Sequence, residues 1–155
     1  MSILRPSERT GDVVAAFDRR LNHPASDPET RQLAANAWCL WESATPEWPP
    51  RPGLAPRFED PKFALAFARI ENHYFVHDAW LNEGQLLRDV ERIRHIPGVI
   101  VQGRYDLATP VRSAWDLHRA WPEADLHLVP DAGHAFDEPG ILARLLDATD
   151  RFAGS

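Results

Sequence analysis

The chain has 155 residues, which is enough for one compact domain or for two small units that share a core. Hydrophobic residues make up 44% and charged residues 26%, a balance that favours a folded core over disorder. The net charge is −6 without any basic cluster, which argues against nucleic acid or an anionic membrane as a partner.

The chain has one cysteine, Cys39, so no disulfide can form within it. Its N-terminus carries no apolar run of signal-peptide length, and no stretch approaches the roughly 20 apolar residues of a membrane span. These features predict a cytoplasmic protein in a reducing compartment.

Four helices are predicted before residue 94, because apolar side chains recur there at helical intervals. Two of them have clear starts, each an aspartate followed by a proline, at Asp27-Pro28 and Asp60-Pro61. Residues 45–56 contain five prolines and predict a loop. The apolar faces are, in chain order, Val13, Val14, Phe17 and Leu21; Leu33, Ala34, Ala37, Trp38 and Trp41; Phe63, Phe67 and Ile70; and Leu86, Leu87, Val90 and Ile93.

The pattern changes after residue 94 to strand, helix, strand, helix. Residues 98–102 form a short apolar run typical of a buried parallel strand, a helix is predicted over 109–121, and 125–129 is a second strand. A last helix is predicted to open at 137–139. This order predicts two parallel strands joined by a right-handed crossover. Since two parallel strands rarely stand alone, we expect the end of a larger sheet, with an unpaired edge prone to association.

Two polar loops follow the predicted strands. Gly103-Arg-Tyr-Asp106 comes after the first strand, and Asp131-Ala-Gly-His134 comes after the second. Functional residues of open parallel sheets gather at the carboxyl ends of strands, so Asp106 and His134 are expected to lie close together. Either residue alone is more typical of a turn. Together they favour a catalytic pair, in which the carboxylate orients an imidazole that acts as a base.

Three segments, at 37–46, 68–81 and 96–141, carry a family resemblance. They read AWCLWESATP, ARIENHYFVHDAWL and IPGVIVQGRYDLATPVRSAWDLHRAWPEADLHLVPDAGHAFDEPGI. These segments resemble the prolyl aminopeptidases (proline iminopeptidases) of the α/β-hydrolase family. The resemblance implies an α/β fold: a helical, substrate-selecting cap over 1–93, followed over 94–155 by the C-terminal part of the parallel sheet, and hence an incomplete fold.

The resemblance also implies roles for four residues in a serine-type peptidase that releases N-terminal proline from peptides. Asp106 and His134 match the triad acid and base, and Glu42 and Glu71 match cap carboxylates that bind the substrate's free amine. It implies no metal and no organic cofactor. Without the family match, both glutamates would be read as parts of solvated helix faces. Aromatic walls for the proline ring would come from Trp38, Trp41, Phe67, Tyr74 and Phe75, although core packing is the better reading of Trp38 and Phe67.

The chain departs from the family pattern in three places. None of the serines, at 2, 7, 26, 43, 113 and 155, lies in a Gly-x-Ser-x-Gly elbow, and no His-Gly-Gly segment precedes them. Without a nucleophile the isolated chain is expected to be inactive. The third departure is 77–79, His-Asp-Ala, where the family tends to have glycines.

Other readings stay open. Another α/β-hydrolase, such as an esterase or epoxide hydrolase, would share Asp106 and His134 but would not need the two glutamates. A non-enzymatic module could instead bind a partner, the missing half or a second copy, through the open sheet edge. His73 and His77 have the spacing of zinc ligands, but the HExxH form is absent and no third ligand is obvious beyond Glu71 or Asp78, so no metal site is expected.

Overall fold

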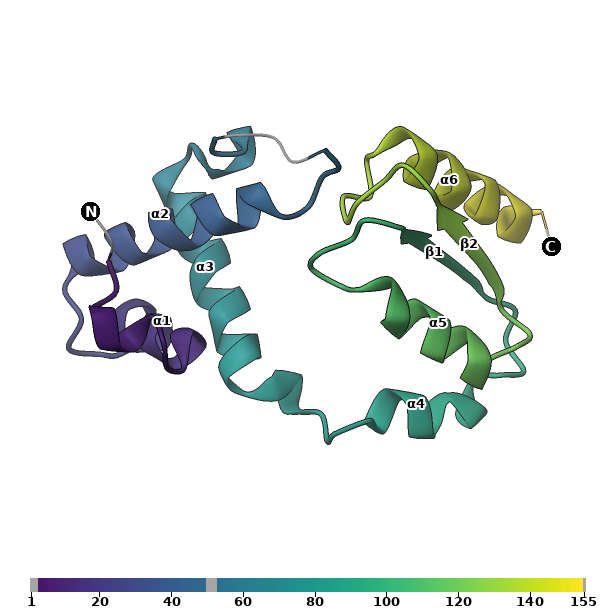
Figure 1. The fold of residues 1–155 in the computed structure, drawn as a ribbon, viewed down its shortest axis with the longest axis horizontal. Coiled ribbons are helices and arrows are strands. Elements are labelled where there is room, and N and C mark those ends of the chain that lie inside the picture. Colours follow the sequence, from purple (N-terminus) through teal and green to yellow (C-terminus); the bar gives the residue numbers. More distant parts are fainter. Residues whose placement is uncertain (1–2, 50–52, 155) are drawn as a thin grey trace. The chain divides into compact units, whose positions relative to one another are not determined.

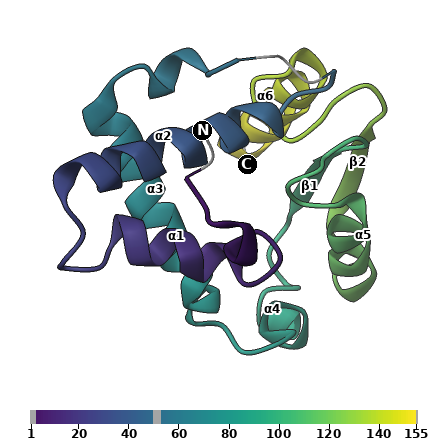
Figure 2. The ribbon, with the colours of Figure 1, turned by 60° about the vertical axis from the view of Figure 1, so that its left-hand side comes forward.

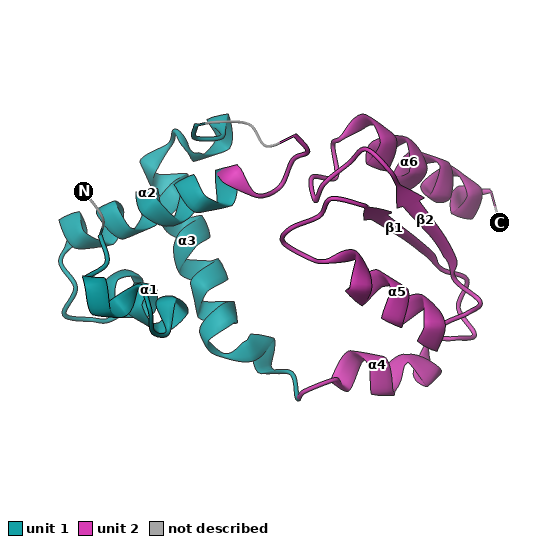
Figure 3. Ribbon diagram, in the orientation of Figure 1, with its two compact units in different colours: residues 1–43, 52–82 teal, residues 44–51, 83–155 magenta. Residues whose placement is uncertain are grey.

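The computed structural model describes residues 3–49 and 53–154 (Figure 1). Contacts divide the chain into two compact units, one made of residues 1–43 and 52–82 and the other of residues 44–51 and 83–155 (Figure 3). The proline-rich segment therefore contributes to both units, and its residues 50–52 lie outside the described part of the chain.

The first unit is helical, as the periodicity predicts. Its three α-helices are α1 (Val13–Leu21), α2 (Pro28–Ala44) and α3 (Pro61–Val76), and short 3₁₀ turns lie at Pro6–Glu8, Pro56–Phe58 and Asp78–Trp80. The predicted caps are confirmed: the Asp27 carboxylate accepts from the amide of Thr30 at 2.9 Å, and the Asp60 carboxylate accepts from the amide of Lys62 at 2.9 Å. Both bonds satisfy helix-start amides that have no partner within the helix.

The core of the first unit is built from small and aromatic side chains on α1, α2 and α3. Trp38 is 4% exposed and meets Phe17 edge to face, with ring centroids 5.2 Å apart. Asn72 is completely buried, and its side-chain amide donates to the carbonyl of Val14 at 3.0 Å, which satisfies a polar group inside the core. The preference for core packing of Trp38 is confirmed.

The turn after α3 has an unusual backbone. Asp78, Ala79 and Trp80 have φ values of 48°, 49° and 57°, in the left-handed region that favours glycine. Each non-glycine residue there costs about 1 kcal/mol or more. The turn includes Asp78 and Ala79, two of the positions at which the resemblance leads us to expect glycine.

The second unit has the predicted order. It consists of α4 (Gln85–Asp89), a 3₁₀ turn (Val90–Arg92), β1 (Val99–Gly103), α5 (Val111–Ala120), β2 (Asp125–Val129) and α6 (Pro139–Ala153). The helix expected over 86–93 is thus split into a short α-helix and a 3₁₀ turn, and the helix expected from Thr109 begins two residues later. β1 and β2 are parallel, in register from Val99 opposite Asp125 to Gly103 opposite Val129.

Helices cover the two faces of this small sheet. α5 and α6 pack against opposite faces of the two strands (Figures 1 and 2). The buried cluster is small, formed by Val129, Ala132 and Ile141 with Val101 and Leu145 against it. Large apolar side chains stay open to solvent, and Leu107 and Phe136 are 65% and 68% exposed.

No helix within residues 3–49 and 53–154 is long and apolar enough to cross a membrane.

Candidate active site

The two loops singled out by the sequence leave the sheet at the same edge. Because Gly103 and Val129 are register partners at the ends of parallel strands, the chain turns out of both strands side by side. The loops then bond to each other: the amide of Arg104 donates to Val129 and the amide of Tyr105 donates to Ala132, both at 2.9 Å. Main-chain bonds therefore hold the two loops together.

A close backbone approach at Gly103 lets the loops meet. A methyl group added there would overlap the carbonyl oxygen of Gly133 and lie 2.7 Å from that of Ala132. Neither neighbour is a flexible side chain that could move aside, so this position requires the absence of a side chain.

We expect Gly103→Ala to destabilise the second unit by about 2–4 kcal/mol, because backbone must shift to admit the methyl group. Urea unfolding of both proteins measures the difference. Gly11→Ala is the matched control, since a methyl group there meets only ordinary contact, 3.6 Å from the carbonyl oxygen of Ser7. Equal stabilities of Gly103→Ala and the unchanged chain would contradict the packing described.

Asp106 and His134 lie within hydrogen-bonding distance, as predicted. His134 Nδ1 is 3.0 Å from Asp106 Oδ2. The Asp106 side chain is 5% exposed, whereas the His134 side chain is 45% exposed. The pair thus has a buried acid and a half-open imidazole, whose second nitrogen, Nε2, is available for another partner.

The carboxylate of Asp106 is surrounded by donors. The amide of Thr109 donates to Oδ1 and its hydroxyl donates to Oδ2, both at 2.7 Å. Burial of the carboxyl group opposes ionisation, but the two bonds from Thr109 and the bond with His134 outweigh it. Together they hold the pKa of Asp106 below its ordinary value, so the acid is a carboxylate near neutral pH.

The loop that carries His134 is also tied to the proline-rich segment. The carbonyl of Pro46 accepts from the amides of His134 and Ala135, at 2.6 and 2.8 Å. The Glu138 carboxylate accepts from the amides of Gly133, at 2.8 Å, and of Trp48, at 3.3 Å. These four bonds fix the main chain on both sides of the imidazole.

The two glutamates lie on α2 and α3 of the first unit. Glu71 accepts a 2.6 Å hydrogen bond from Trp38 Nε1. Glu42 follows Trp38 by four residues on α2, which places the two on one helix face. Burial raises the pKa of the Cys39 thiol to about 11, and the negative charges of Glu71 and Glu42 contribute to this increase. Both carboxylates therefore lie around the same stretch of α2.

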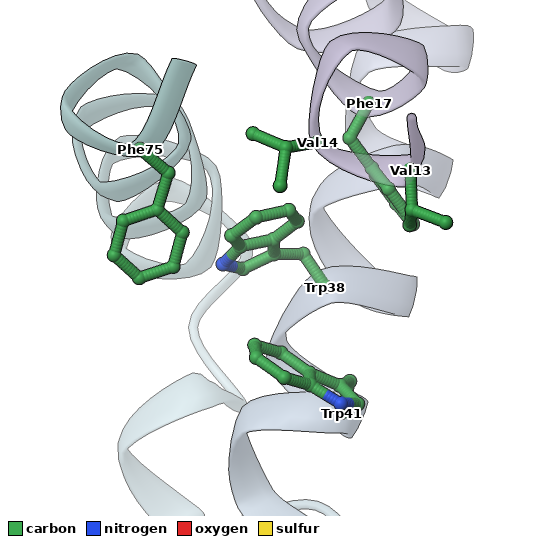
Figure 4. A pocket seen from close by; sticks show the side chains of 6 residues that line it. All are labelled: Val13, Val14, Phe17, Trp38, Trp41 and Phe75. Carbon is green, nitrogen blue, oxygen red and sulfur yellow. The ribbon is translucent and has the colours of Figure 1, made fainter. Parts of the chain in front are cut away.

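An apolar pocket of about 410 Å³ opens in the first unit beside Trp38 (Figure 4). Figure 4 shows the Trp38 indole between the side chains of Val14, Phe75 and Trp41. Trp38 thus packs in the core and also forms a pocket wall, while its indole nitrogen contacts Glu71. The lining residues are Val13, Val14, Phe17, Trp38, Trp41 and Phe75.

Two aromatic candidates lie away from this pocket. Phe67 packs against the buried core cluster, as preferred from the sequence. Tyr74 meets Trp80 edge to face, with ring centroids 5.2 Å apart. Of the five aromatic residues expected to wall a substrate pocket, Trp38, Trp41 and Phe75 line this one.

His73 and His77 share a helix face, with ring centroids 4.5 Å apart, and His77 Nδ1 lies 2.8 Å from the carbonyl of His73. Among the described side chains, no group of three His, Cys, Asp or Glu residues could hold a metal ion.

Sequence reasoning missed several residues around the pair. Thr109 was read only as the start of a helix, and Pro46 only as part of a loop. The aspartate-to-threonine spacing of three residues is a signal for the former, since an Asp side chain commonly accepts from an amide two or three residues on. No comparable signal exists for Pro46, whose partners lie 88 and 89 residues further along the chain.

Comparison with known proteins yields long matches. The chain is 51% identical over 148 residues to a probable proline iminopeptidase of Leptolyngbya boryana, covering 95% of this chain and 46% of that protein. It is 50% identical to the proline iminopeptidase of Xylella fastidiosa strain 9a5c, covering 98% and 48%. It is 48% identical to that of Arabidopsis thaliana, covering 96% and 39%. No family model matches the chain.

These matches and the parallel sheet with its flanking helices make the chain a partial-length relative of the α/β-hydrolases. Within that class it is homologous to the proline iminopeptidases, a family of peptidases, at fragment length. The chain spans about half the length of the curated relatives it matches.

Proposed function

We propose that this chain supplies the substrate-selecting cap, residues 1–93, and the acid and base, in residues 94–155, of a serine-type aminopeptidase that releases N-terminal proline from peptides. The observation that carries the proposal is the 3.0 Å contact between His134 and a buried Asp106 at the carboxyl edge of the strands. Homology to proline iminopeptidases supports the same reaction.

The reaction needs a nucleophile from outside this sequence. None of the six serines has the Gly-x-Ser-x-Gly setting. His134 Nε2 takes the proton of that serine as its oxygen attacks the carbonyl carbon of the N-terminal proline. The imidazolium is stabilised by Asp106 at Nδ1, and it then returns the proton to the leaving amine. A second round with water releases proline.

Selection for an N-terminal residue comes from charge. A peptide that begins with proline carries a cationic amine and a compact apolar ring. Glu42 and Glu71 bind the amine, and the aromatic pocket next to Trp38 suits the ring. In this proposal a peptide that lacks a free amine loses its charge-assisted contact with both carboxylates.

Complementation tests the proposal. A proline–chromophore amide is offered to this chain alone and to this chain mixed with a separately expressed N-terminal half of a related full-length enzyme. Activity is expected only in the mixture, because only the mixture contains all three triad residues. Binding of the two halves without hydrolysis would contradict the enzymatic proposal and favour an interaction module. Size-exclusion chromatography of the mixture reports the binding separately.

A further inference from the structure

We propose that Thr109 is a positioning residue that holds His134 in the tautomer with its proton on Nδ1, an inference that rests on the proposed roles of His134 and Asp106. Thr109 lies in the loop between β1 and α5, three residues after Asp106 and directly before Pro110. The family resemblance assigns Thr109 no role.

The geometry is a closed triangle of polar atoms. Thr109 Oγ1 is 2.7 Å from Asp106 Oδ2 and 3.2 Å from His134 Nδ1, and Oδ2 and Nδ1 are 3.0 Å apart. All three distances allow hydrogen bonds. The hydroxyl therefore contacts both members of the pair rather than one of them.

Counting hydrogens assigns the direction of each bond. Asp106 is ionised near neutral pH and can only accept, so the single hydroxyl hydrogen of Thr109 goes to Oδ2. Toward His134, Thr109 Oγ1 can then only accept. Both neighbours of Nδ1 are thus acceptors, which requires the hydrogen of the neutral imidazole to lie on Nδ1. Nε2 is left with a lone pair, the form that a general base needs.

The Gln102 side chain also bonds to the Asp106 carboxylate and to the main chain of the same loop. Its side-chain nitrogen lies 3.0 Å from Asp106 Oδ2 and 3.1 Å from the carbonyl oxygens of Gly103 and Thr109. All three neighbours are acceptors, which fixes the amide group with its nitrogen toward them. Gln102 is 9% exposed, so its bonds to Asp106 and to the Thr109 carbonyl lie in the interior.

The bonds between Thr109 and Asp106 alone do not indicate a functional role, because at the start of α2 the amide and hydroxyl of Thr30 donate to the two carboxylate oxygens of Asp27 in the same way, at 2.9 and 2.7 Å. What distinguishes Thr109 is the 3.2 Å contact of its hydroxyl with His134 Nδ1. α5 begins at Val111 after Pro110, with no side-chain cap, so Thr109 Oγ1 does not serve as the cap of that helix. The Thr109 amide donates to Asp106 Oδ1, and the hydroxyl contacts both Asp106 Oδ2 and His134 Nδ1.

The first test uses the unmodified chain. Nitrogen-15 NMR of the His134 ring in alkaline buffer, where imidazole is neutral, distinguishes the two tautomers without any need for activity. A predominant Nδ1–H form is expected. A predominant Nε2–H form would overturn the inference, whatever the outcome for the proposed function.

Two variants separate the hydroxyl from the shape of the side chain. Thr109→Val keeps the shape but loses the hydroxyl, and Thr109→Ser keeps the hydroxyl. We expect Thr109→Val to lower the Nδ1–H fraction and to raise the pKa of Asp106, followed by carbon-13 NMR of its carboxyl group, because one donor to the carboxylate is lost. Thr109→Ser should match the unmodified chain in both readouts.

A folded Thr109→Val protein that matches the unmodified chain in tautomer and in carboxyl titration would overturn the inference. If that variant does not fold, Thr109→Ala, which also lacks the hydroxyl, replaces it in both readouts. In the reconstituted pair we expect Thr109→Val to lower kcat roughly tenfold, as for the loss of one hydrogen bond to a charged group. A mixture that is inactive even with the unmodified chain counts against the proposed function alone, because both NMR readouts are independent of it.

Discussion

Replacing His134 with alanine should lower proline release by the reconstituted pair by about 10⁴-fold or more. In the proposed mechanism the imidazole accepts the serine proton, and no other described side chain contacts Asp106 with a nitrogen base. Initial rates with a proline–chromophore amide measure the loss. The Asp106 carboxylate would remain in place but would have no proton acceptor to orient.

The structure predicts that this variant keeps its fold. The amide of residue 134, rather than its side chain, donates to Pro46, and this bond survives in alanine. His95→Ala is the matched control, since His95 is an exposed histidine of the same unit. Far-UV circular dichroism should be unchanged in both variants. If His134→Ala keeps more than about a tenth of the activity, His134 is not the base.

The pairing of Asp106 with His134 could be predicted because it follows from topology. Parallel strands end at one edge, and the crossover helix α5 leaves β2 beside β1. Asp106 and His134 are the third and fifth residues after their strands, so both stay close to that edge. Apolar periodicity located the strands to within one residue, so their polar neighbours were placed as well.

The supports of the pair could not be predicted in the same way. The carbonyl of Pro46 has no side-chain signature, and its bonds to 134 and 135 depend on how the chain folds back. The sequence indicates only that Gln102 is a polar residue at the end of a strand. Its bonds to three acceptors depend on the folded loop. Tertiary contacts of this kind follow from the assembled fold rather than from local pattern, and they hold the main chain at His134 and the Asp106 carboxylate in place.

The two glutamates present a mixed case. Their residue types and helices were predicted, but periodicity alone cannot distinguish a solvated carboxylate from a binding one. What the structure adds is the contact of Glu71 with the indole of Trp38, which also lines an apolar pocket. A carboxylate beside an aromatic pocket can bind a group that is cationic at one end and apolar at the other.

We expect Glu71→Gln to lower kcat/KM for the proline–chromophore amide about 100-fold in the reconstituted pair, as for a lost charge-assisted contact of about 3 kcal/mol. The reason is the loss of negative charge opposite the substrate amine. Glutamine keeps an oxygen that can accept from Trp38 Nε1, so the packing beside the pocket should be preserved. Steady-state kinetics with the amide measure the change.

The discriminating measurement uses a chromogenic ester without an amine. Its hydrolysis by Glu71→Gln should equal that of the unmodified pair, because the triad is intact and there is no cation to bind. Glu59→Gln, at an exposed position of the same unit, controls for a general loss of charge. An equal loss on both substrates would make Glu71 a structural residue. No loss on either would favour an esterase, since only an amine-selective enzyme needs a carboxylate at this position.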